Sequence, residues 1–161
     1  MGRLRTTDRK MPAGSPCPCG SGRAYGDCCG PFLEGAAVPQ TAEQLMRSRY
    51  TAHVQGDGDW LLATWHPATR RARIDLADQV RWIGLEVLAT QGGGPGDSKG
   101  TVEFVARYKR GGRAHRLHER SRFERRNGGW LYVDGDPEPV ANANQDLVPE
   151  TRGDDPSGSS G

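Results

Sequence analysis

The spacing of apolar residues changes partway along the chain, from a helical period to a strand-like alternation. Residues 41–55 place apolar side chains on one helical stripe, with polar residues on the other faces. Thr41 stands at the N-cap position of this stripe, and Gln44 follows three residues later, as in a capping box. Gly56 ends the predicted helix, and residues 59–64 predict a second, short helix.

The second half of the chain has the pattern of an antiparallel meander. A further short helix or turn is expected over 73–80, and a Gly-rich connection over 91–100. Gly111-Gly112 and Asn127-Gly128 are hairpin-turn sequences. Strands are expected over 82–90, 101–110, 113–126 and 130–133. Helices followed by about four such strands predict an α+β domain in which the helices pack on one face of a sheet.

Composition narrows the part of the chain that can form this domain. Only 34% of the 161 residues are hydrophobic, and the chain contains 23 Gly and 11 Pro. Residues 1–16 and 141–161 are polar and aperiodic, so we expect a disordered N-terminal tail and a disordered acidic C-terminal tail. The remainder divides into a Cys-rich segment, 17–35, and the α+β domain, 36–140.

Nothing in the sequence predicts a membrane protein or an exported one. No apolar run approaches the ~20 residues that a membrane span needs. The basic N-terminus is not followed by the apolar stretch of a signal peptide. We therefore expect a cytoplasmic protein, whose thiols stay reduced.

Charge is distributed unevenly, although the formal net charge is only +2. Residues 107–126 carry nine Arg or Lys against two Glu, which gives +7, and residues 134–161 carry seven Asp or Glu against one Arg, which gives −6. One side of the strand predicted over 113–126 is a basic face, made of Arg116, His118, Arg120 and Arg122. This face is either neutralised by the acidic segment or available to RNA phosphates.

All four cysteines fall within thirteen residues, as the close pairs Cys17/Cys19 and Cys28/Cys29. Tetrahedral zinc takes four thiolates at about 2.3 Å, and two close pairs joined by a Gly-rich turn can supply them. Disulfides are the alternative, but such closely spaced cysteines bond to each other only with strain. The sequence thus predicts one structural Zn²⁺ ion with no open coordination position. We expect backbone amides and Arg23 to offset the charge of the four thiolates.

The Cys-rich segment CPCGSGRAYGDCCG resembles the SEC-C motif, the zinc knuckle at the C-terminus of the preprotein-translocase ATPase SecA. In SecA the motif docks the export chaperone SecB and ribosomes. The resemblance implies zinc binding by the four cysteines and a protein partner for the knuckle. The loop differs from the usual pattern, because Arg23, Ala24, Gly26 and Asp27 stand where several lysines are typical. Docking through a strongly basic loop is therefore not implied.

The order of the elements resembles the cone-shaped nuclear-transport-factor-2-like fold. In that fold a curved sheet wraps a long first helix and leaves a pocket between them. The whole arrangement resembles the YchJ-like family, bacterial proteins with a SEC-C knuckle ahead of such a domain. This resemblance implies a fold without assigning an activity. It is carried by CPCG at 17–20, CCGPF at 28–32, TAEQLMRSRY at 41–50, HERSRF at 118–123 and WLYVDGD at 130–136.

Three residues are candidates for the implied pocket: Arg49 and Tyr50 on the helical stripe, and Glu119 on the Leu117/Phe123 face of its strand. A charge on an inward face is costly unless it is paired. We therefore hypothesise that Arg49 and Glu119 meet in the pocket as an ion pair. Such a pair is either purely structural or a clamp for a ligand.

Catalytic residues stay unassigned. Besides carboxylates, of which Glu119 is the best candidate, the general-base candidates are His53, His66, His115 and His118. None of them stands at a spacing that reproduces a recognisable catalytic pattern. His115 and His118 are expected on opposite faces of one strand and so cannot act as a pair.

Three classes of function follow from these features. The leading one is a zinc-binding adaptor, with the knuckle docked on a protein partner and the pocket holding a ligand or second partner. The second is a small-molecule enzyme that uses the pocket, and the third is a ribosome- or RNA-associated protein. We favour the first, which is not enzymatic.

Overall fold

The computed structural model describes residues 11–70 and 80–137. After a single 3-10 turn, η1 (Tyr25–Asp27), come the helices α2 (Gly30–Leu33), α3 (Ala42–Gln55) and α4 (Gly58–Ala63). The strands are β1 (Arg81–Gly92), β2 (Lys99–Arg110), β3 (Arg113–Arg126) and β4 (Gly129–Pro137). The expected C-terminal tail and nearly all of the segment 73–80 lie outside the described residues. Within the described ranges, no helix is long and apolar enough to cross a membrane.

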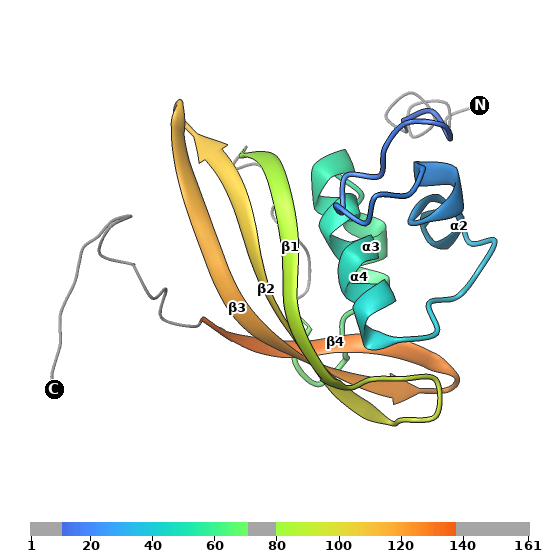
Figure 1. Cartoon of the computed structure of the whole chain (residues 1–161). Coiled ribbons are helices and arrows are strands. Elements are labelled where there is room, and N and C mark those ends of the chain that lie inside the picture. Colours follow the sequence, from blue (N-terminus) through green and yellow to red (C-terminus); the bar gives the residue numbers. More distant parts are fainter. Residues whose placement is uncertain (1–10, 71–79, 138–161) are drawn as a thin grey trace, which may run out of the picture.

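The four strands form one sheet in the order β1-β2-β3-β4, with each strand antiparallel to its neighbour. Figure 1 shows a strongly curved sheet with the helices on its concave side, so the α+β prediction is confirmed. The two predicted tight turns join β2 to β3 and β3 to β4. Both central residues of each turn have positive φ, from 52° at Asn127 to 82° at Gly112 and Gly128, which suits tight hairpins.

Helix α3 is the long helix inside the curve. Its N-cap is Thr41, whose Oγ1 accepts a hydrogen bond from the Gln44 amide at 3.0 Å. The Gln44 side chain reaches one residue further than a capping box predicts, since it accepts from the Gln40 amide at 2.7 Å. Gly56 ends the helix in the left-handed conformation at φ 73°. The buried stripe of α3, which includes Ala42, Leu45, Met46 and Tyr50, faces the sheet.

The Cys-rich knuckle and the sheet domain share one core. Cys17, Cys19, Tyr25 and Cys29 belong to the same buried cluster as the side chains of α3 and the sheet. Residues 11–16, expected in a disordered tail, form part of the knuckle instead. The Gly26 amide donates to the Ala13 carbonyl at 2.8 Å, and Met11 packs on the core. The boundary expected at residue 16 is therefore wrong, because these residues supply backbone partners to the second cysteine turn.

The segment after α4 attaches that helix to the far edge of the sheet. Trp65 forms an isolated parallel bridge with Tyr132 of β4. The Tyr132 amide donates to the Thr64 carbonyl, and the His66 amide donates to the Tyr132 carbonyl, both at 2.8 Å. This bridge closes one end of the space between α3 and the sheet and brings the Trp65 and Tyr132 rings to 5.9 Å.

Candidate metal centre and ligand pocket

The four cysteine sulfurs lie within 4.8 Å of one another, as the spacing of the two pairs predicted. The sulfurs of Cys19 and Cys28 are 3.6 Å apart. Four sulfurs placed tetrahedrally at about 2.3 Å from an ion would be about 3.8 Å apart. The cluster therefore fits a tetrahedral metal ion bound by four thiolates. Cys17, Cys19 and Cys29 are buried, while Cys28 is partly exposed.

Two local turns position the cysteine pairs. A bridge between Pro16 and Ala24 closes the first loop, and the Cys17 amide donates to the Arg23 carbonyl at 2.9 Å. Gly20 adopts a φ of 79°, and any side chain there would collide with the Leu85 carbonyl of β1 at 2.7 Å. In the second pair, Cys28 is the C-cap residue of η1, and Cys29 is the N-cap residue of the short helix α2.

The cation beside the sulfurs is Arg47 of α3, not Arg23. Its Nη1 donates to the Cys19 carbonyl at 2.7 Å and lies 3.8 Å from the Cys19 sulfur. Glu43 holds the same guanidinium by accepting from its Nε at 2.9 Å. Arg23 takes part in the turn through its backbone. No pattern in the sequence pointed to Arg47, since it lies 28 positions from Cys19 and only the packing of α3 on the knuckle brings them together.

The thiols of the cluster compete with one another for ionisation. Burial, more than the nearby charge of Cys19, raises the pKa of the Cys28 thiol to about 11. Hydrogen bonds to Cys17 and Cys19, together with burial, raise the pKa of Cys29. Hydrogen bonds from Cys17 and Cys29 lower the pKa of the Cys19 thiol. A bound divalent ion removes this competition, because it stabilises all four thiolates at once.

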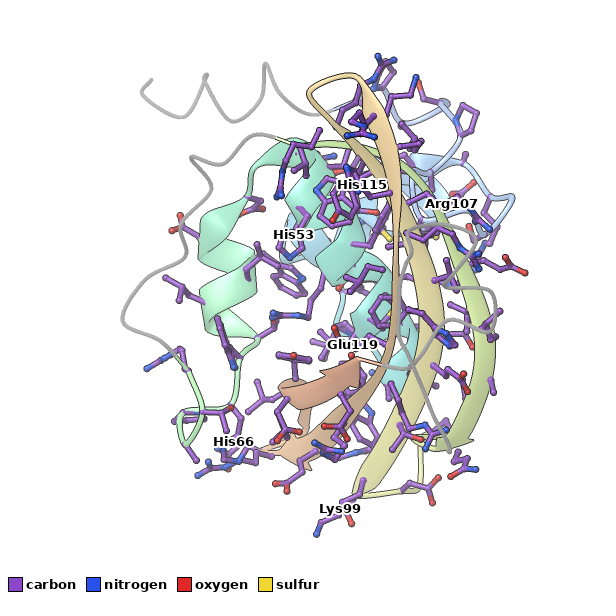
Figure 2. All side chains as sticks on the ribbon, turned by 90° about the vertical axis from the view of Figure 1, so that its left-hand side faces the viewer. His53, His66, Lys99, Arg107, His115 and Glu119 are labelled. Atoms are coloured by element: carbon purple, nitrogen blue, oxygen red, sulfur yellow. The ribbon has the colours of Figure 1, made fainter. Side chains whose placement is uncertain are left out.

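A cavity of about 400 Å³ lies between α3 and the concave face of the sheet. Most of its wall is apolar, with Met46, Tyr50, Trp65, Trp82, Phe104 and Leu117 among the lining residues. Its polar members include Arg49, His53, Glu119 and Ser121. In Figure 2, His53 and Glu119 lie toward the space between helices and sheet, whereas Arg107 lies on the outer side. The structure thus brings Arg49, Tyr50 and Glu119 to one cavity.

Arg49 and Glu119 do not form the direct ion pair that we hypothesised. Arg49 Nη1 donates to the Leu61 carbonyl at 2.8 Å and to Thr64 Oγ1 at 2.7 Å. The guanidinium carbon lies 4.6 Å from the centre of the Tyr132 ring, whose hydroxyl is 3.5 Å from Glu119 Oε2. Tyr132 thus stands between the two charges. The bridge between Trp65 and Tyr132 places this part of β4 next to Arg49.

Burial shifts the ionisation of the groups in this cavity. It lowers the pKa of Arg49 to about 10, so the guanidinium stays charged at neutral pH. Burial, and then the charge of Arg49, lowers the pKa of His53 to about 4, so this imidazole is neutral. Burial, ahead of the neighbouring charge of Glu119, raises the pKa of Tyr132 to about 12.

Glu119 is fixed by neighbours on two strands. Its Oε2 accepts a hydrogen bond from Ser121 Oγ at 3.0 Å. A Cβ at Gly135 of β4 would overlap the Glu119 carboxylate, so a side chain there would displace it from this position. The alternation of β3 predicted that Ser121 shares a face with Glu119. The sequence did not predict that Tyr132 and Gly135 lie beside Glu119, since their position relative to it depends on the β3–β4 register.

The basic face of β3 is paired with carboxylates of its neighbouring strands. His118 Nε2 lies 2.7 Å from Glu103 of β2, which also lies 3.8 Å from Arg120. Arg122 donates to Asp134 at 2.6 Å and to Asp136 at 2.8 Å, both on β4. Arg116 stands opposite Arg107 in the β2–β3 register. Much of the positive charge of this face is therefore compensated within the sheet.

The other histidines lie apart from one another. His115 stacks on Tyr108 with ring centres 5.2 Å apart, on the face opposite to His118, as predicted. His66 lies 3.4 Å from Glu124, near the lower edge of the view in Figure 2. No two histidines meet in the cavity within the described residues, where only His53 lines the wall.

Comparison with known proteins places the chain in a class defined by both parts of this structure. The SEC-C motif matches residues 15–31, and the model described as "YchJ, middle NTF2-like domain" matches residues 41–135. A UPF0225 protein of Streptomyces coelicolor is 55% identical over 121 residues, which cover 75% of this chain and 94% of that protein. A UPF0225 protein of Ralstonia nicotianae is 55% identical over 144 residues, covering 80% and 97%.

Two solved structures share the fold. A SEC-C motif containing protein from Rhodopseudomonas palustris, solved in solution, superposes with a TM-score of 0.67 at 38% identity, covering 74% of this chain and 96% of that one. A crystal structure of a SEC-C motif containing protein from Psychrobacter arcticus gives a TM-score of 0.64 at 27% identity, covering 82% and 88%. The chain therefore belongs to the YchJ-like, or UPF0225, family: a SEC-C motif followed by a nuclear-transport-factor-2-like domain.

Proposed function

We propose that this protein is a zinc-stabilised binding protein whose cavity holds a small ligand. One observation carries the proposal. A cavity of about 400 Å³ with an apolar wall contains a charged guanidinium, Arg49, and a carboxylate, Glu119, that do not neutralise each other directly. Ligand sites commonly have 300–1,000 Å³, an apolar wall and a few polar groups that orient the ligand.

Zinc is the ion that four thiolates in a closed tetrahedral site favour, and its role here is structural. The metal would hold the two cysteine turns against α3, the helix that also carries Arg49 and Tyr50. Zinc thus supports the pocket without entering its chemistry. Four reduced thiols at such a site also agree with a cytoplasmic location, which we propose on that ground.

Filling the cavity tests the binding role. Zinc-loaded protein is screened against a library of small organic fragments by thermal shift and by the fluorescence of Trp65 and Trp82, which line the wall. Ala106→Leu adds three carbons inside the cavity and is expected to abolish the binding of hits. Ala89→Leu makes the same change at an exposed position of β1 and should leave it intact. Hits that bind both variants equally, or no hits at all, would refute the proposal.

The enzymatic alternative depends on Glu119 acting as a base toward a bound molecule. Glu119→Gln keeps the size of the side chain, so it should retain ligand binding if the cavity only binds. Turnover of a bound ligand by the parent, lost in this variant, would favour the enzyme instead. The alternative of RNA binding has less support, since the basic face is largely ion-paired.

A second binding role concerns the region where the knuckle meets the first turns of α3. A groove of about 510 Å³ lies there, with lining residues that include Arg23, Asp27, Phe32 and Arg47. The SEC-C motif gives this groove a candidate partner class, the export chaperone SecB or the ribosome. Direct titration of zinc-loaded protein with purified SecB and with ribosomes tests it, with Arg23→Glu as the variant expected to weaken binding. Equal binding by this variant and the parent would contradict docking at the groove.

A further inference from the structure

Arg49 is a buried cation whose hydrogen-bond partners are neutral. Both acceptors of its Nη1 are uncharged oxygens, the Leu61 carbonyl and the Thr64 hydroxyl. Within the part of the chain that the structure describes, no carboxylate lies within ion-pair distance of its guanidinium. Desolvation of an ion without an anionic partner is costly, and the lowered pKa of about 10 reflects that cost. A positive charge therefore stands at the wall of the cavity without a directly paired carboxylate among residues 11–70 and 80–137.

The guanidinium is also oriented for a two-point contact. An Arg side chain has five N–H donors in a planar fork, and the contacts of Arg49 engage Nη1 alone. Tyr132 covers one face of the plane at 4.6 Å, and Trp65 lies 5.9 Å away. These contacts fix the plane while leaving donors of Nε and Nη2 for an acceptor. A carboxylate matches such a fork with two parallel hydrogen bonds.

The rest of the cavity suits an apolar, flat body. Tyr50 and Trp82 meet edge to face at 5.7 Å, and Phe104 and Phe123 continue the wall. A volume of about 400 Å³ lies within the range of small-molecule sites and leaves room for one or two fused rings. Aromatic walls favour stacked or edge-on aromatic ligands.

Glu119 limits the charge of the ligand. Its carboxylate lines the same cavity, so a second negative group on the ligand would meet repulsion there. A phosphate carrying two charges is disfavoured for this reason. A neutral donor such as a hydroxyl, by contrast, can donate to Glu119 alongside Ser121 and Tyr132.

From these contacts we propose that the cavity binds small aromatic monocarboxylates, with the carboxylate on the guanidinium of Arg49 and a ring hydroxyl or amine directed toward Glu119. This inference names the ligand class of the proposed binding function and rests on it. Arg49 then acts as the specificity-determining residue of the site.

The test compares charged probes with their neutral isosteres on zinc-loaded protein. Binding of 4-hydroxybenzoate and 1-naphthoate is measured by calorimetry against 4-hydroxybenzamide and 1-naphthamide, with inorganic phosphate as a further probe. Each carboxylate is expected to bind at least about tenfold more tightly than its amide, as a charge-assisted hydrogen bond implies. Phosphate is expected not to compete. Amides that bind as tightly as the carboxylates, or phosphate that binds more tightly, would overturn the inference.

Variants assign the preference to Arg49. Arg49→Met should abolish the preference for the carboxylate, and Arg49→Lys should keep part of it while losing the two-point contact. Arg122→Met, on the exposed outer face, is the matched control and should change nothing. The comparison in the parent protein stands even if Arg49→Met does not fold. An unchanged preference in folded Arg49→Met or Arg49→Lys would overturn the role of Arg49.

Failure of this inference is distinguishable from failure of the proposed function. Fragments of other classes that bind the parent but not Ala106→Leu, with no response to carboxylates, would refute the ligand class and leave the binding function standing. Absence of any binding sensitive to Ala106→Leu would refute both.

Discussion

Chelation of the proposed zinc ion is expected to destabilise the sheet domain as well as the knuckle, because the two share one core. Among the described residues, four of the 14 in the main buried cluster come from the knuckle: Cys17, Cys19, Tyr25 and Cys29. An ion bound by all four sulfurs would link the two cysteine turns, and its removal breaks that link. Release of these turns uncovers the side of α3 that carries Thr51 and Arg47.

The size of the effect follows from what the knuckle buries. Tyr25 is only 2% exposed, and its return to water would cost about 2–3 kcal/mol of stability. The surfaces of α3 and β1 that the knuckle covers would add a comparable amount, for a total of about 5 kcal/mol. That is a large share of the 5–15 kcal/mol that stabilise a typical domain. At about 4 °C for each kcal/mol, the Tm should fall by about 20 °C.

The assay follows the metal and the fold separately. Zinc release to a colorimetric chelator reports the site, while calorimetry and near-UV circular dichroism report the packing of aromatic residues such as Trp82 and Trp130 in the sheet. Tyr25→Ala in zinc-loaded protein should reproduce part of the loss, and Tyr25→Phe, which keeps the ring, should reproduce little of it. A sheet that keeps its Tm after complete loss of zinc would refute the shared core and make the knuckle an independent appendage.

Three other perturbations have expected outcomes. Arg47→Met removes the cation beside the sulfurs and should weaken zinc retention by about 10–100-fold in chelator competition. Gly135→Ala forces the Glu119 carboxylate to move and should lower the free energy of unfolding by about 1–3 kcal/mol in urea titrations. His53, with its pKa lowered from 6.5 to about 4, binds a proton more tightly in the unfolded chain, so its stabilisation is complete above pH 6.5 and is lost as the pH falls toward 4. His53→Gln should remove that slope, about 1.4 kcal/mol per pH unit at most, from unfolding midpoints measured between pH 4 and 7.

Each of these outcomes has a control. Arg23→Met should retain zinc as the parent does, since Arg23 acts through its backbone, and equal loss in both variants would contradict the role of Arg47. Gly84→Ala, where a Cβ meets nothing within 4 Å, should be nearly neutral, and a cost equal to that of Gly135→Ala would discount the clash with Glu119. Parallel pH profiles for parent and His53→Gln protein would show that the imidazole is not responsible.

Several parts of the site could be predicted from local sequence. The four sulfurs are brought together by turns whose ends lie within thirteen residues, so their spacing alone indicated a metal site. The alternation along β3 likewise predicted which residues face the helices, Glu119 and Ser121 included. Both predictions depend on geometry that repeats over a few residues.

The relation between Arg49 and Glu119 could not be predicted in the same way. Sequence reasoning placed both charges on inward faces and paired them because a buried charge requires compensation. The structure satisfies Arg49 with the carbonyl of Leu61 and the hydroxyl of Thr64, and it inserts the Tyr132 ring between the charges. That arrangement depends on the bridge from the end of α4 to β4, which joins residues 67 positions apart.

Short-range spacing and periodicity were enough to predict the cysteine cluster, the order of helices and strands, and the side of each strand that faces the helices. The packing of distant elements decides that the knuckle is part of the main core and that Arg47 is the cation at its sulfurs. It also decides that Arg49 lines the cavity without a carboxylate partner in the part of the chain that the structure describes. These contacts join elements far apart in the chain, and their existence depends on how α3 packs against the knuckle and the curved sheet.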